Sequence, residues 1–121
     1  MGEEIPDGWT INRHAEIDNQ VYETLMHTSK DVCLEITPSQ EHTSRGPVDI
    51  YSVILKRNVG KITESSEILD TEENLFDFDE ARELAFSYIE IFNEEYKKHQ
   101  DPDVAAVEAH RRYKEIETPE F

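Results

Sequence analysis

Hydrophobic and polar residues alternate along much of the first half of the chain, which is typical of β-strands that bury one face. The segment GWTINRHAEI places apolar residues mainly at every second position from Trp9 to Ile17. The runs VYETLMHT and DVCLEIT continue this alternation, and the short link SK between them predicts a hairpin. Two more strands are expected at VDIYSVILKRN, which is apolar on both faces, and at KITESSEIL, which charged and polar residues mark as an edge strand.

The segment PSQEHTSRGP, residues 38–47, interrupts this pattern. It contains two prolines and a glycine and has no apolar periodicity, so we expect a polar loop between two strands. Because the segment is longer than a hairpin turn needs, we expect it to be the most mobile part of the chain.

The second half of the chain changes to the three- and four-residue spacing of amphipathic helices. In LFDFDEARELAFSYIEIFNEEY, Asp77 is expected to cap the helix, and Glu80 completes a capping box. The sequence QDP ends this helix, and a second helix is expected at about residues 103–117, with Asp101 or Asp103 as its cap. The apolar stripe of the first helix consists of Phe78, Ala81, Leu84, Ala85, Tyr88, Ile89, Phe92 and Tyr96.

Together these elements predict an α+β fold of two layers. We expect an antiparallel sheet of four or five strands, a long helix packed on one face, and a shorter C-terminal helix. The length of 121 residues fits a single domain over residues 1–121, with its core at residues 8–98 and loose ends at 1–7 and 118–121.

The sheet face opposite the long helix is expected to be apolar, and a contiguous apolar face is rarely left open. The C-terminal helix has few apolar residues to cover it, so we predict a homodimer in which a second copy does so. The alternative is a monomer that its own second helix covers. The residues expected on this interaction face are Tyr22, Met26, Tyr51, Val53 and Leu55.

The formal net charge of −16 is the dominant feature of the composition. Residues 1–70 carry 13 acids and 6 bases, and residues 71–121 carry 15 acids and 6 bases, so the acidity is spread along the chain. This charge argues against binding to nucleic acid or anionic lipid at ordinary salt, because phosphate contacts need lysine and arginine. Three interpretations stay open: solubility, adaptation to a saline cytoplasm, or an acidic face that binds a basic protein or mimics a nucleic-acid backbone.

The composition partly supports and partly opposes adaptation to a saline cytoplasm. Six lysines are few for 121 residues, which favours it. Glutamate outnumbers aspartate by 19 to 9, and isoleucine outnumbers valine by 11 to 7, which is not typical of halophilic proteins.

The order of predicted strands followed by the helix FDFDEARELAFSYIEIF resembles that of small uncharacterised acidic proteins of haloarchaea. In those proteins a β-meander precedes a helix. The resemblance implies a fold and a halophilic habitat, and it implies no activity. The residues that carry it are Phe76, Asp77, Glu80, Ala81 and Ala85.

The sequence contains no recognisable catalytic, cofactor-binding or metal-binding pattern. Its four glycines form no phosphate-binding loop, and the single cysteine, Cys33, has no CxxC partner for zinc. A nucleophilic or metal-binding arrangement would need Cys33 to meet His14, His27 or His42 in the fold. The alternative is a small buried thiol beside surface histidines. We therefore expect a protein that is not an enzyme and that uses no cofactor or metal.

Basic residues gather in two segments, RGPVDIYSVILKRNVGK and HRRYK. Either segment is a candidate contact to an anion or, at high salt, to a nucleic acid. The alternative is ordinary pairing with neighbouring acids. The candidate anion contacts are Lys56, Arg57, Arg111 and Arg112.

Apolar runs in this chain fall short of the roughly 18 residues that span a bilayer, and MGEEIPDGW lacks the apolar stretch of a secretion signal. We therefore expect a soluble, cytoplasmic protein without membrane contact. The expected function is a non-enzymatic protein-interaction module that acts as a homodimer. The alternatives are an acidic nucleic-acid mimic that inhibits a DNA-binding protein, and a small nucleic-acid binder that works at high salt.

Overall fold

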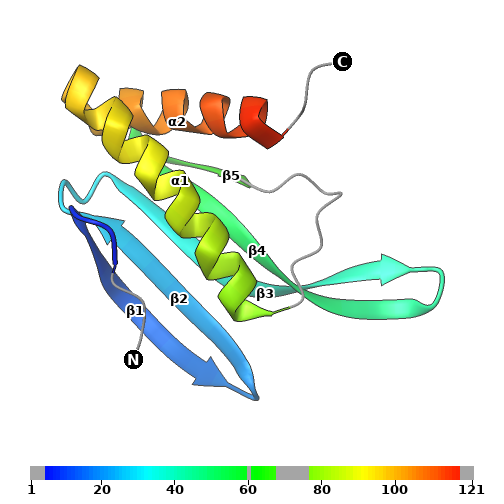
Figure 1. Ribbon diagram of the computed structural model, residues 1–121. Helices are drawn as coiled ribbons and strands as arrows, with labels where there is room; N and C mark the ends of the chain where they lie inside the picture. The colour runs from blue at the N-terminus through cyan, green and yellow to red at the C-terminus, as the bar shows by residue number, and fades with distance from the viewer. Residues whose placement is uncertain (1–4, 60, 68–76, 118–121) are drawn as a thin grey trace.

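Five antiparallel strands follow one another in sequence order and form a single sheet, with two helices packed on one face (Figure 1). The computed structural model describes residues 5–59, 61–67 and 77–117. The expected α+β fold of two layers, with a long helix and a shorter C-terminal helix, is confirmed. The elements are β1 (Trp9–Ile17), β2 (Gln20–His27), β3 (Val32–Thr43), β4 (Gly46–Val59), β5 (Ile62–Glu67), α1 (Phe78–His99) and α2 (Pro102–Glu117).

Short turns join the first three strands. Asp18 and Asn19 connect β1 to β2 with φ angles of 53° and 66°. Aspartate and asparagine adopt this left-handed region more readily than other non-glycine residues, and two such residues in succession suit the twist of a tight hairpin. Between β2 and β3, Lys30 has a φ of 68°, and its backbone N–H donates to the carbonyl oxygen of His27 at 2.9 Å.

The prediction of a loop at residues 38–47 is wrong, because β3 and β4 continue their pairing through this segment. The register runs from Pro38 opposite Tyr51 to Thr43 opposite Gly46, and a two-residue turn closes the hairpin. Figure 1 shows that this end of the hairpin extends beyond both helices. Because no helix covers it there, the strands need no apolar residues, and the polar sequence that suggested a loop belongs to a ladder.

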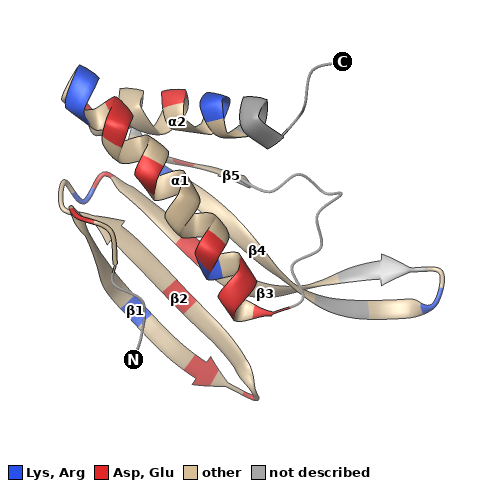
Figure 2. Cartoon of the chain, viewed as in Figure 1, with Lys and Arg blue, Asp and Glu red and all other residues tan. Residues whose placement is uncertain are grey.

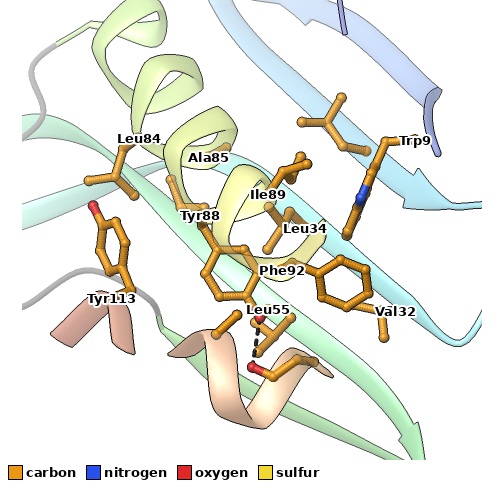
Figure 3. Close-up of a cluster of buried hydrophobic side chains, with 14 of the residues drawn as sticks. Trp9, Val32, Leu34, Leu55, Leu84, Ala85, Tyr88, Ile89, Phe92 and Tyr113 are labelled. Carbon is orange, nitrogen blue, oxygen red and sulfur yellow. Dashed lines mark hydrogen bonds between the residues drawn. The ribbon is translucent and has the colours of Figure 1, made fainter. Parts of the chain in front are cut away.

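The core lies between the sheet and α1 (Figure 3). Tyr88, Ile89 and Phe92 of α1 are fully buried together with Leu34 and Leu55 of the two neighbouring strands β3 and β4. Burying a large apolar side chain stabilises the fold by about 1.5–3 kcal/mol, so this cluster is a main source of stability. The core residues are Trp9, Leu25, Val32, Leu34, Ile36, Val53, Leu55, Ala81, Leu84, Ala85, Tyr88, Ile89, Phe92, Ala105, Ala106, Ala109 and Tyr113.

The start of α1 agrees with its predicted cap. The Asp77 carboxylate accepts a hydrogen bond from the backbone N–H of Glu80 at 2.8 Å, which satisfies one of the unpaired donors of the first turn. The helix ends at Gln100, whose φ of 54° lets its N–H donate to the carbonyl oxygen of Tyr96 at 2.8 Å.

The second helix packs on α1 rather than across the opposite face of the sheet. Asp101 is its cap, because its carboxylate accepts from the N–H groups of Asp103 and Val104 at 2.9 and 3.2 Å. Small residues such as Ala105 and Ala109 are buried and let the two helices approach closely. The hydroxyl of Tyr88 donates to the Ala106 carbonyl oxygen at 2.9 Å and ties α1 to α2. Neither helix, over the part of the chain described above, is long and apolar enough to cross a membrane.

Candidate functional site

The face of the sheet opposite both helices is called the open face here, and the face beneath them is the covered face. The strand register assigns each side chain to one face, because alternate residues point to opposite sides. Residues on β2, β3 and β4 of the open face are only partly exposed, since their neighbours screen one another. The open-face residues of β1 to β4 include Thr10, Arg13, Ala15, Tyr22, Thr24, Met26, Cys33, Glu35, Thr37, Ser52, Ile54 and Lys56.

The five residues predicted for one interaction face lie on two different faces. Val53 and Leu55 are 0% and 1% exposed and belong to the core on the covered face. Tyr51 lies on the same side, where its ring packs on Phe78 and its hydroxyl accepts from the Val21 N–H at 3.1 Å. The prediction is therefore wrong for these three residues. Tyr22 and Met26 lie on the open face as expected, and Ile54 takes the place that Val53 and Leu55 were assigned.

The open face differs from the rest of the chain in its charge. Among the open-face residues of β1 to β4 named above, Glu35 is acidic, whereas Arg13 and Lys56 are basic. At the edge of this face, β5 pairs with β4 and brings the acidic position Glu67 opposite Ile54. The Lys56 ammonium lies 3.0 Å from the Glu35 carboxylate, and this ion pair crosses from β4 to β3. Figure 2 shows acidic residues recurring along α1, away from this face. The open face is therefore nearly neutral in a chain whose formal net charge is −16.

A buried carboxylate joins β1, β2 and α1 on the covered face. The Glu23 side chain is 1% exposed, and its two oxygens lie 2.9 Å from His14 Nδ1 and 3.2 Å from Arg82 Nε. The guanidinium of Arg82 also lies over the rings of Phe78 and Phe86. Removing a carboxylate from water is costly unless the charge is paired, and His14 and Arg82 are the partners of Glu23 in this cluster.

A second buried carboxylate fixes α1 to α2. Glu95 is 4% exposed, and its carboxylate accepts from Arg112 at 2.7 Å and from Lys98 at 3.4 Å. The hydrogen bond from Arg112 holds the pKa of Glu95 below its usual range, with a further contribution from Lys98. Arg112, one of the candidate anion contacts, therefore has a structural role at the helix interface.

The four candidate anion contacts do not form a single basic stripe. Lys56 points to the open face, whereas Arg57 lies on the covered face and pairs with Glu64 at 2.6 Å and with Asp103. Arg111 pairs with Glu108 on its own helix at 2.8 Å. Arg57 and Arg111 do line one common cavity of about 260 Å³, whose other walls include Leu55, Ser66, Val107 and His110. Pairing with neighbouring acids, the alternative considered from the sequence, describes all four basic residues.

Cys33 and the histidines lie on opposite sides of the sheet. Cys33 is on the open face, next to Met26, whereas His14 and His27 are on the covered face. Burial raises the pKa of the Cys33 thiol, and the nearby Glu35 raises it further, so the thiol is a weak nucleophile at neutral pH. The side chain of His42 lies outside the described residues.

The position of His27 differs most clearly from the one considered from the sequence. It was expected at the surface, yet it is 2% exposed, and its ring lies between those of Trp9, Phe92 and Tyr96 at centroid distances of 5.3, 4.9 and 4.8 Å. The sequence signal for this burial is the position of His27 two residues after the buried Leu25, because residues two apart in a strand point to the same face.

Within residues 5–59, 61–67 and 77–117, no group of three or more histidine, cysteine, aspartate or glutamate side chains is arranged to hold a metal ion. Comparison with protein-family models, with curated protein sequences and with solved structures gives no match to this chain. The resemblance to acidic haloarchaeal proteins stays a prediction, and of the residues that carry it, Phe76 lies outside the described part of the chain.

Proposed function

We propose that this protein is a non-enzymatic interaction module whose open face is buried against the open face of a second copy. The observation that carries this proposal is the charge balance of the open face in a chain of net charge −16. In a two-fold symmetric contact each surface patch meets itself. A face that holds both signs of charge can pair with itself, whereas an acidic face meets only like charge.

The composition of the open face also suits a contact between two sheets. Met26, Cys33 and Ile54 form an apolar centre on the three middle strands, and hydroxyl groups of Thr24 and Ser52 lie around it. Two sheets that pack face to face interlock side chains of this kind at a separation of about 10 Å. Hydroxyl groups in such a contact can hydrogen-bond across it or to trapped water.

The size of the face limits the strength of the dimer. Five strands about 4.8 Å apart and a paired length of about 20 Å give a footprint of roughly 480 Å² on each copy. The total of about 1,000 Å² lies at the lower limit for a specific interface, so we expect a dissociation constant in the micromolar range. The acids outside the open face repel one another between copies, so salt strengthens the dimer until the charges are screened, at a few tenths molar.

Sedimentation velocity over a concentration series from about 1 µM to a few hundred µM tests the proposal. Ile54→Lys places a charge at the centre of the open face, and we expect it to weaken the dimer by about tenfold or more. Ile62→Lys is the matched control, because Ile62 is 67% exposed on the edge strand β5 and the substitution makes the same change in net charge. The proposal fails if the unmodified chain stays a monomer throughout, or if both variants dissociate equally.

A second candidate function follows from the exposed side of α1, which carries a row of acids. Glu83, Glu90 and Glu94 are exposed and recur at helical spacing, about 10 and 6 Å apart along the axis. Such a row suits a basic protein partner or the role of a nucleic-acid mimic. A decalysine peptide is the probe: replacing these three acids by glutamine should weaken its binding more than replacing Glu16, Asp18 and Asp31 by their amides. Equal losses would mean that net charge alone attracts the peptide.

A further inference from the structure

A cavity of about 270 Å³ lies on the helix side of the molecule, between the segment before β1, the β2–β3 turn and the C-terminal half of α1. Its walls include Asp7, Gly8, His27, Thr28, Asn93 and Lys97. The volume is just below the range of pockets for drug-sized ligands, so it suits a small organic molecule. The open face used by the proposed dimer lies on the other side of the sheet, so the two sites are independent.

The hydrogen bonds of His27 determine which ring nitrogen carries its proton. The backbone N–H of Ser29 donates to His27 Nδ1 at 3.2 Å, so this nitrogen is an acceptor and is unprotonated. The Ser29 hydroxyl lies 2.8 Å from the same nitrogen, and it accepts from the N–H of Asp31, so its own proton is directed to the ring. The neutral ring therefore carries its proton on Nε2.

The Nε2–H group of His27 faces the cavity wall that Gly8 forms. A methyl group added at Gly8 would lie 3.8 Å from His27 Nε2, so this donor is within van der Waals reach of the space that Gly8 leaves without a side chain. Gly8 has a φ of 84°, a conformation that favours glycine, so no side chain fills the cavity at this position. Burial lowers the pKa of His27, although Asp31 offsets part of the effect, and the ring stays a neutral donor at pH 7.

The walls of the cavity are held by hydrogen bonds between distant segments. Asn93 accepts from Trp9 Nε1 at 3.2 Å and donates to the Asp7 carbonyl oxygen at 3.0 Å. The N–H of Thr28 donates to the Gly8 carbonyl oxygen at 2.9 Å. These contacts fix the cavity before any ligand enters, which lowers the entropic cost of binding.

Several side chains that line the cavity can donate hydrogen bonds. His27 offers Nε2–H, Thr28 offers a hydroxyl, and Lys97 offers an ammonium group. Among the residues that the structure describes, Lys97 has no carboxylate within ion-pair distance, whereas the neighbouring Lys98 pairs with Glu95. A ligand that complements this set of groups must bring acceptors and a negative charge.

We propose that this cavity binds a small monocarboxylate, with the carboxylate held between Lys97 and the Nε2–H group of His27. The single charge follows from the surroundings. Asp7 also lines the cavity and the chain carries a net charge of −16, so a dianion such as phosphate or a dicarboxylate meets stronger repulsion.

Benzoate is the probe, and its neutral isostere benzamide is the control ligand. Titration of the isotopically labelled full chain, followed by NMR, reports binding at the ¹⁵N signals of the His27 ring and at the backbone amides of residues 93–97. We expect saturable benzoate binding that shifts the His27 Nε2 signal, and weaker or no binding of benzamide. Lys97→Gln should reduce benzoate affinity by about fivefold, the usual effect of one partly exposed charge pair.

Lys98→Gln is the matched control, since it removes the same charge from the adjacent position of α1 without touching the cavity. Its benzoate affinity should stay within about twofold of that of the unmodified chain. Equal affinities for benzoate and benzamide, equal effects of the two lysine variants, or no saturable shift in tens of millimolar benzoate would each overturn the proposal.

Discussion

The two faces of the sheet come from alternate residues of the same strands, but the polar groups on them have different surroundings. The covered face buries Glu23 and His27 and gives each a fixed set of partners from other elements. The open face keeps its polar groups partly solvated and pairs Lys56 with Glu35 across neighbouring strands. The covered face therefore stabilises the fold, and we expect substitutions on the open face to have little effect on the stability of a single copy.

The largest expected contrast is between truncations on the two faces. Phe92→Ala leaves a cavity in the covered face, where Phe92 is fully buried, and should lower the free energy of unfolding by about 3–5 kcal/mol. Met26→Ala on the open face removes a partly exposed side chain and should cost about 1 kcal/mol or less. Urea unfolding at low micromolar concentration measures both. Similar losses would mean that the open face also belongs to the core.

A smaller contrast is expected between two carboxylates. Glu23→Gln leaves Arg82 as a charge with little solvent exposure and no carboxylate to balance it, so we expect a loss of about 2–4 kcal/mol. Glu35→Gln breaks a partly exposed pair and should cost less than about 1 kcal/mol. The same urea measurement compares them, and a larger loss for Glu35→Gln would contradict the assignment of the faces.

The smallest effect concerns pH and His27. Burial lowers the pKa of this histidine in the folded chain, so between its usual value of about 6.5 and the lower folded value the unfolded chain binds more protons. Stability from this group is therefore present above about pH 6.5 and is lost as the pH falls below it. Asp31, Asp7 and Lys97 are the charged groups near the ring.

Urea unfolding at several pH values between about 5 and 8 checks this sign. His27→Gln should flatten the dependence below pH 6.5. A wild-type slope that survives in His27→Gln would assign the proton uptake to another group.

Local patterns in the sequence were enough to predict the fold class and the start of α1. Alternation over residues 9–36 predicted the strands, and the carboxylate of Asp77 before the apolar stripe predicted the cap. Both features depend on neighbours within a few residues, so the chain itself carries the information.

The faces of β4 could not be assigned in this way. Residues 48–55 are largely apolar on both sides, and a period of two alone does not tell which side a distant helix covers. The pairing of Tyr51 with Phe78 and the burial of Val53 come from contacts across the chain. His27 is different, because its parity with Leu25 was visible in the sequence, although its aromatic neighbours were not.

The labelling rate of Cys33 reports whether two copies bury their open faces against each other. This single cysteine lies in the middle of the open face, so its reaction with a maleimide reports how accessible that face is. If two copies bury their open faces together, the rate constant per thiol should fall as protein concentration rises through the dissociation constant. In Ile54→Lys it should stay high over the same range. A rate constant that is independent of concentration in the unmodified chain would contradict the account.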